Sequence, residues 1–209
     1  MAELRVPDPV ERDDLGAFAA RAVRLDGGAL VRLRARGERV DAWVSTPFDA
    51  LVTRSVPGSV SPADVTVGGP DLLAALAVVG GEVVDPGRPQ DLRWRSALPP
   101  DEGWHDVEAV PAGVLAELAD RGAEVAREHP GPHGPPAALL DQKVITVSGG
   151  GFDVGVPLRC LFALSGMGFV GAHGADETVR VSATDAWLRL DARYGAVVRR
   201  RHALLPLLV

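Results

Sequence analysis

The chain has 209 residues and a formal net charge of −6, and 46% of its residues are hydrophobic and 24% charged. A chain of this length forms one domain or two small ones with a proper hydrophobic core, and the composition is that of a globular protein. The negative charge disfavours broad, non-specific binding to nucleic acid. The single cysteine, Cys160, excludes an internal disulfide and fits a reducing compartment.

No apolar run approaches the roughly 20 residues that a membrane-spanning helix needs. The N-terminal residues also lack the basic and apolar regions of a signal peptide. We therefore expect a cytoplasmic protein that makes no contact with a membrane.

The first hundred residues predict an α+β unit. Leu15, Phe18 and Ala22 form an apolar helical stripe between Asp8 and Leu25. Alternating apolar and charged residues then predict three strands, and a strand–helix–strand segment follows them. These elements are expected at residues 30–36, 40–45, 50–55 and 64–84.

A cluster of turn residues at 85–90 (Asp-Pro-Gly-Arg-Pro-Gln) interrupts this pattern and is a candidate boundary. Just beyond it, Leu92, Trp94 and Ser96 have the spacing of one face of a further strand. We expect an N-terminal unit at residues 1–100 and a C-terminal unit at residues 101–209, and the sequence leaves the sheet topology of residues 58–110 open.

The second half predicts a long helix, a loop rich in proline and glycine, a short helix, a hairpin, a second helix and a three-stranded meander. Pro157 suits the first position of the second helix, because a proline lacks the N–H that would be unpaired there. The expected segments are residues 111–128, 137–142, 143–156, 157–167 and 178–201. The predicted fold class is α+β with mostly antiparallel sheets, two similar helix-plus-three-strand units at the two ends and a helical middle.

The two ends of the chain also share a short motif. Residues 48–54 and 194–200 both follow the pattern aromatic-x-Ala-aliphatic-Val-x-Arg. An internal repeat is one explanation. A chance match in a chain rich in valine and leucine is the other, and the sequence leaves both open.

No catalytic constellation is recognisable, so catalytic residues stay unknown and no cofactor is expected. His129 and His133 have the spacing of a metal-binding pair, but Pro130 and Pro132 prevent the helix that would bring their rings together. The basic cluster Arg199, Arg200 and Arg201 is a candidate contact for an anion or a nucleic acid. Its alternative role is to protect a strand at the edge of a sheet from unwanted pairing.

The order long helix, short helix and hairpin at residues 111–156 resembles a winged helix-turn-helix, in which the second helix contacts DNA. The segment Val-x-Val-Pro-x-x-x-Leu at residues 154–161, with the meander at 178–201, resembles half of a domain of the DNA sliding clamps, and residues 15–57 resemble the other half. This resemblance implies the βαβββ building block of the clamps at both ends of the chain. The excess of arginine, with one lysine among 22 basic residues, is typical of a GC-rich bacterial genome. The chain as a whole resembles an uncharacterised actinobacterial family.

An orderly hydrophobic framework without clustered catalytic residues favours a non-enzymatic binding or scaffolding module. We expect it to act through an exposed sheet edge or the apolar C-terminal tail (residues 203–209), on a protein partner or on itself as a homodimer. A DNA-binding protein and an enzyme with a site between the two units are the alternatives. The enzyme would require a deep pocket that holds at least two convergent titratable groups.

Overall fold

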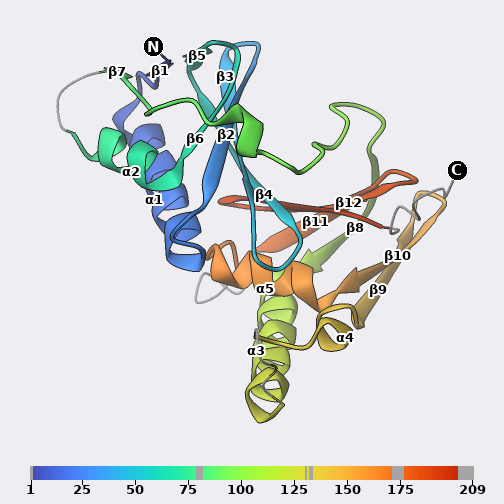
Figure 1. The fold of residues 1–209 in the computed structure, drawn as a ribbon. Coiled ribbons are helices and arrows are strands. Elements are labelled where there is room, and N and C mark those ends of the chain that lie inside the picture. Colours follow the sequence, from blue (N-terminus) through green and yellow to red (C-terminus); the bar gives the residue numbers. More distant parts are fainter. Residues whose placement is uncertain (1, 79–81, 130, 132–133, 171–176, 202–209) are drawn as a thin grey trace, which may run out of the picture. The chain divides into compact units, whose positions relative to one another are not determined.

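The computed structural model describes residues 2–78, 82–129, 131, 134–170 and 177–201 (Figure 1). The chain divides into two compact units: unit 1 runs to Ala97 and includes Gly166–Gly168, and unit 2 contains the remaining residues. Among the described helices, none is both long and apolar enough to cross a membrane.

Unit 1 begins with helix α1 (Pro9–Leu25), followed by the meander of β2 (Leu30–Arg36), β3 (Arg39–Ser45) and β4 (Leu51–Pro57). The helix starts where the sequence predicts, because the carboxylate of Asp8 accepts a hydrogen bond from the Val10 N–H at 2.8 Å and caps the helix. The side chains of Leu15 and Phe18 are buried beneath it.

After the meander the chain adds β6 (Asp64–Gly68) to the outer side of β2, so the order of these strands is β6-β2-β3-β4. Helix α2 (Gly69–Ala77) follows directly and packs against α1. A separate three-stranded sheet joins β5 (Ser59–Ser61), β1 (Glu3–Arg5) and β7 (Val83–Val84) in that order.

Unit 2 starts with β8 (His105–Pro111) and helix α3 (Ala112–Glu128), and a four-residue helix α4 (Ala137–Leu140) leads to the hairpin of β9 (Lys143–Gly149) and β10 (Phe152–Pro157). Helix α5 (Leu158–Gly166) is mostly buried, with Ser165 exposed near its C-terminal end. It precedes the meander β11 (Thr178–Ala183), β12 (Trp187–Ala192) and β13 (Gly195–Arg200), and β8 pairs with β11 in the strand order β8-β11-β12-β13.

The two units therefore share one internal plan with a different chain order. In each, a helix leads into a three-stranded meander, and a fourth strand that pairs with the first meander strand leads into another helix. In unit 1 the fourth strand, β6, follows the meander, whereas in unit 2 the fourth strand, β8, precedes it. The expected α+β fold with similar units at both ends is confirmed.

The sequence motif shared by residues 48–54 and 194–200 aligns β4 and β13 differently from the structure, by one residue. Val52 pairs with Val44, and Arg54 reaches α1, so both lie on the helix-covered face of their sheet. Val197 pairs with the fully buried Leu190, which places Val197 and Arg199 on the corresponding face of unit 2. The sequence motif aligns Arg54 with Arg200 instead, and a shift of one residue moves a strand side chain to the opposite face.

The strand predicted from Leu92, Trp94 and Ser96 is wrong. Residues 91–93 form a 3-10 turn, η1 (Asp91–Arg93), and the chain continues without regular structure to Pro100. Three strands that the sequence analysis did not propose, β1, β5 and β8, are present.

Candidate functional site

The predicted metal pair is only partly described. His129 is exposed at the C-terminal end of α3, and its Nδ1 lies 3.3 Å from the carbonyl oxygen of Val125. His133 lies outside the described residues, so the pair stays a prediction. Among the residues that the structure describes, no group of three or more His, Cys, Asp or Glu side chains is placed to hold a metal ion.

The predicted arginine cluster is divided between the two faces of β13. A guanidinium nitrogen of Arg199 lies 3.6 Å from the Asp141 carboxylate, which also accepts hydrogen bonds from the buried Arg159 at 2.7 and 2.9 Å. Arg200, on the opposite face, places its guanidinium 4.5 Å from the centre of the Trp187 ring. Both side chains therefore contribute to the fold of unit 2, and an anion would have to compete with these contacts.

Arg201 holds the β9–β10 hairpin to the meander. Its guanidinium donates to the carbonyl oxygens of Thr184 and Asp153, each at 2.9 Å, and lies 5.4 Å from the centre of the Phe152 ring. The same Phe152 ring also lies near His105, with 5.3 Å between the two ring centres. The anion or nucleic-acid role of the three arginines remains a prediction.

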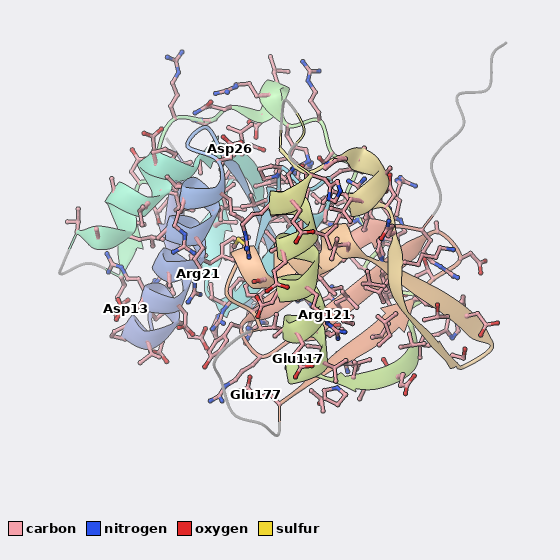
Figure 2. The ribbon with its side chains drawn as sticks, turned by 90° about the horizontal axis from the view of Figure 1, so that it is seen from below. Asp13, Arg21, Asp26, Glu117, Arg121 and Glu177 are labelled. Carbon is pink, nitrogen blue, oxygen red and sulfur yellow. The ribbon has the colours of Figure 1, made fainter. Side chains whose placement is uncertain are left out.

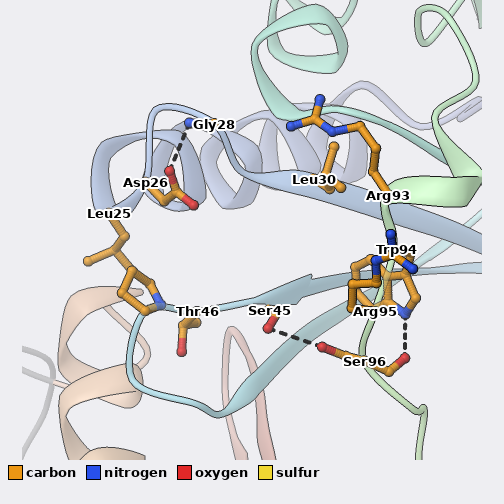
Figure 3. Close-up of a pocket in the computed structure, with 11 residues that line it drawn as sticks. Leu25, Asp26, Gly28, Leu30, Ser45, Thr46, Arg93, Trp94, Arg95 and Ser96 are labelled. Atoms are coloured by element: carbon orange, nitrogen blue, oxygen red, sulfur yellow. Dashed lines mark hydrogen bonds between the residues drawn. The ribbon is translucent and has the colours of Figure 1, made fainter.

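Unit 1 contains an open pocket of about 560 Å³ that the sequence analysis did not find (Figure 3). Three segments distant in sequence form its walls: the turn between α1 and β2, the turn between β3 and β4, and the irregular segment after η1. We call it the unit 1 pocket, and its lining consists of Leu25, Asp26, Gly28, Leu30, Ser45, Thr46, Pro47, Arg93, Trp94, Arg95 and Ser96.

Short hydrogen bonds fix the first two walls. Asp26 ends α1, and its carboxylate accepts the Gly28 N–H at 2.8 Å. In the second wall the hydroxyl of the buried Thr46 donates to the carbonyl oxygen of Ala50 at 2.8 Å, and the turn is completed by Asp49 with a φ of 55°. Aspartate tolerates this left-handed conformation better than most residues.

The third wall is attached to the outer edge of β6. The Gln90 N–H donates to the carbonyl oxygen of Thr66 at 2.7 Å, and the Asp91 carboxylate accepts the Thr66 N–H at 2.6 Å. The chain then returns toward the second wall, where the Ser96 hydroxyl donates to the Ser45 hydroxyl at 3.2 Å (Figure 3). Because both backbone groups of Thr66 are satisfied in this way, the segment is held along the sheet without being a strand.

The indole of Trp94 connects the third wall to itself and to Arg32 of β2. Its N–H donates to the carbonyl oxygen of Ser96 at 2.5 Å, and the guanidinium of Arg32 lies 5.9 Å from the ring centre. Arg32 also forms a bidentate ion pair with Asp64, in which its Nε and Nη2 each donate to a different carboxylate oxygen at 2.7 Å. The hydrogen bond to Asp64 is the main reason that the pKa of Arg32 is raised, so this arginine stays positively charged beside the Trp94 ring.

The chemistry of the unit 1 pocket is suited to binding. The titratable groups in its lining are one carboxylate, Asp26, and two guanidinium groups, Arg93 and Arg95. The hydroxyls of Ser45 and Ser96 bond to each other, and the lining places no histidine or second carboxylate beside them as a general base. The pocket therefore offers hydrogen-bond donors and positive charge, but no pair for proton transfer.

Residues 99–204, just over half of the chain, match the family model described as Domain of unknown function (DUF8185). The chain belongs to this family. Residues 1–96 match a second model, Domain of unknown function (DUF8010), which brings the unit 1 pocket within that match. No curated protein matches the chain.

Solved structures show that this DUF8185 member has the fold of the bacterial sliding clamps. A candidate DNA polymerase III beta subunit from Eubacterium rectale ATCC 33656 is 12% identical, with a TM-score of 0.64 over 97% of this chain. The pol III beta protein of Caulobacter crescentus is 14% identical (TM-score 0.60, 98% of this chain), and the DNA polymerase sliding clamp of Pseudomonas aeruginosa is 12% identical (0.59, 99%). The chain spans 65–66% of the length of these proteins. The resemblance of the terminal segments to the clamp building block is thus confirmed at the level of the fold.

The helices of this DUF8185 member carry little excess positive charge. Helix α3 has four acidic and two basic side chains, and α1 has three of each. Figure 2 shows Glu117 close to Arg121 on α3, and it shows Asp13 and Arg21 at separate positions along α1. Acidic side chains equal the basic ones in number on α1 and exceed them on α3, so neither helix has the excess of basic groups that DNA binding uses.

Proposed function

We propose that this protein is a non-enzymatic binding scaffold and that the unit 1 pocket holds a segment of a partner protein. The observation that carries the proposal is the lining of the pocket, which has positive charge and hydroxyl groups but no acid–base or nucleophile–base pair. Its volume, about 560 Å³, lies within the range of roughly 300–1,000 Å³ that is typical of ligand sites.

The sheet edges support the pocket as the binding site. Gln90 and Asp91 already occupy the outward backbone groups of Thr66 at the centre of the β6 edge. In unit 2, Gly149 lies so close to the β8 backbone that an added Cβ would be 2.1 Å from the Val107 carbonyl oxygen. A partner strand would have to displace these contacts, so strand addition at either edge is less favourable than docking in a preformed pocket.

DNA binding is the weaker candidate. The net charge of −6 and the mixed charges of α1 and α3 provide little attraction for a phosphate backbone. Helix α4, in the position of the recognition helix of a winged helix-turn-helix, has four residues, Ala-Ala-Leu-Leu, and none of their side chains is polar. Such a helix supplies no hydrogen bond to a base edge.

A pocket-filling substitution tests the proposal. Ser45 is exposed in the pocket, so Ser45→Phe fills space without disturbing the core, and Ser59→Phe on β5 is a matched change at an exposed serine outside the lining. The immobilised wild-type protein and the Ser59→Phe variant are expected to retain the same partner from an extract of the source cells, and Ser45→Phe is expected to lose it. A partner retained equally by all three proteins would contradict binding at the pocket, as would a substrate turned over by the wild type and not by Ser45→Phe.

Self-association is the second form of this proposal. If the partner is a second copy of the chain, light scattering after gel filtration will show a dimer for the wild type and for Ser59→Phe. The Ser45→Phe variant will then be a monomer. A monomeric wild type at all concentrations would leave a different protein as the partner.

A further inference from the structure

We propose that the unit 1 pocket recognises carboxylate side chains in an acidic segment of its partner, with Arg93 and Arg95 as the contacting groups. This inference rests on the proposed function, because it names the chemistry of the segment that the pocket holds. It is carried by the balance of charge in the lining, where two guanidinium groups face one carboxylate.

The single carboxylate does not neutralise the two arginines. Asp26 accepts the N–H of Gly28 at 2.8 Å on the opposite wall (Figure 3). Arg93 donates to the neutral side-chain oxygen of Gln90. Within the described part of the chain, no ion pair or hydrogen bond is formed by the side chain of Arg95. The pocket therefore keeps positive charge that an anionic ligand can neutralise.

Some arginines on the neighbouring strands are paired with carboxylates. Arg32 is paired with Asp64 at 2.7 Å, and Arg36 with Asp41 at 2.6 Å. Arg39 on β3 instead donates to the hydroxyl and carbonyl oxygens of Ser55. Among the residues that the structure describes, Arg93 and Arg95 form no ion pair with a carboxylate, so a carboxylate of the partner can supply their counter-charge.

Neutral donors add to this positive charge. The hydroxyl oxygens of Ser45 and Ser96 lie 3.2 Å apart, and Ser45 is exposed in the lining, where its hydroxyl can donate to a ligand. A guanidinium group forms two parallel hydrogen bonds with a carboxylate, and a hydroxyl supplies a third donor. These groups together match the oxygen atoms of an Asp or Glu side chain.

Leu92 suggests that the segment also contains an apolar residue. It lies on η1 directly before Arg93, and 91% of its surface is exposed. A leucine exposed to this degree on a turn that is anchored to β6 is available for contact with a partner. An acidic protein segment fits this combination of leucine and arginine better than a nucleic acid does, because its apolar side chains can contact the exposed Leu92 while its carboxylates pair with the arginines, whereas a phosphate backbone offers no aliphatic side chain.

The test uses the full chain and a fluorescein-labelled decapeptide of alternating Glu and Leu, whose binding is followed by fluorescence anisotropy. A Gln–Leu decapeptide of the same length is the uncharged probe, and a twelve-residue oligothymidine is the nucleic-acid probe. The variants are Arg95→Glu and Arg93→Glu, with Arg88→Glu as the matched control, because Arg88 is exposed on the same segment and does not line the pocket. Circular dichroism of each variant establishes that it is folded.

We expect the Glu–Leu peptide to bind, with an affinity that falls at least tenfold in Arg95→Glu or Arg93→Glu and less than about twofold in Arg88→Glu. The binding should also weaken as salt is added. Equal losses in the Arg88→Glu control, preferential binding of the Gln–Leu peptide, or tighter binding of the oligothymidine through the same arginines would overturn the inference.

The outcomes separate this inference from the proposed function. If the Gln–Leu peptide binds and Ser45→Phe abolishes that binding while Arg95→Glu does not, the pocket is a binding site but its ligand is not acidic. If neither peptide binds and Ser45→Phe retains every partner of the wild type, both the pocket's function and its proposed ligand are refuted.

Discussion

The contact between helices α3 and α5 can be tested with one methyl group. Gly122 of α3 faces Leu158 of α5, and a Cβ at position 122 would lie 2.5 Å from Leu158 Cδ1 and 2.8 Å from Cδ2. Leu158 is 1% exposed, so its side chain has little room to move away. The Gly122→Ala substitution therefore brings two helices of unit 2 into conflict.

Two effects of opposite sign determine the result. Replacing a glycine within a helix by alanine stabilises the helix by about 1 kcal/mol. Overpacking a buried contact costs about 1–3 kcal/mol. The free energy of unfolding should fall by about 0–2 kcal/mol. Gly113, in the first turn of the same helix, has no atom within 4 Å of an added Cβ, so Gly113→Ala should be neutral or stabilising.

Urea denaturation followed by circular dichroism compares the two variants, and a double-mutant cycle identifies the contact. Leu158→Ala alone should cost about 2–5 kcal/mol. In the Gly122→Ala background it should cost at least about 1 kcal/mol less, because the new methyl group fills part of the space. If Gly122→Ala stabilises the protein as much as Gly113→Ala does, the close packing of α3 on Leu158 is refuted.

Three further predictions concern an edge, an ion pair and DNA. Asp91→Ala removes the acceptor of the Thr66 N–H, and since Thr66 is 1% exposed, thermal denaturation should show a loss of about 1–3 kcal/mol that Asp91→Asn partly restores. An unchanged thermal midpoint in Asp91→Ala would mean that the hydrogen bond from the Thr66 N–H at the edge of β6 does not stabilise the fold. Asp141→Ala leaves the 8%-exposed side chain of Arg159 without this carboxylate and should cost about 1–3 kcal/mol in urea denaturation, whereas Asp141→Glu should cost less. Equal losses in the two variants would refute the ion-pair explanation. In a filter-binding assay at low salt the protein should not retain duplex DNA, and retention that weakens steeply with salt would contradict the argument from helix charge.

The regular elements were largely predictable because local chemistry determines them. The strands at residues 30–36 and 178–183 alternate apolar and polar side chains, and Asp8 marks the start of α1. The strand β8 was not predicted, because most of its side chains are exposed and it therefore lacks the alternation of a half-buried strand. The spacing of Trp94 and Ser96 indicated a strand, but contacts with Thr66 and Ser45, distant in sequence, decide the conformation of that segment.

The pocket could not be found from the sequence. Its walls come from residues 25–30, 45–47 and 93–96, and no motif connects them. The hydrogen bonds of Thr66 with residues 90–91 and of Ser96 with Ser45, together with the turn after α1, bring Asp26 and Arg95 into one site. The charges were visible in the sequence, but the presence or absence of a neutralising neighbour depends on the sheet register.

The different chain order of the two units bears on how each one forms during synthesis. In unit 1 the strand that completes the sheet, β6, follows its partner β2 after only β3, β4 and β5, so Gly68 can pair with Leu30 as soon as the meander has been made. In unit 2, β8 is made first and its partner begins only at Thr178. Until then the backbone of β8 remains unpaired, and this more distant pairing favours slower folding of the C-terminal half. A nascent chain that stalls between Pro111 and Thr178 would therefore present a completed first sheet and an unfinished second one to the chaperones of the cell.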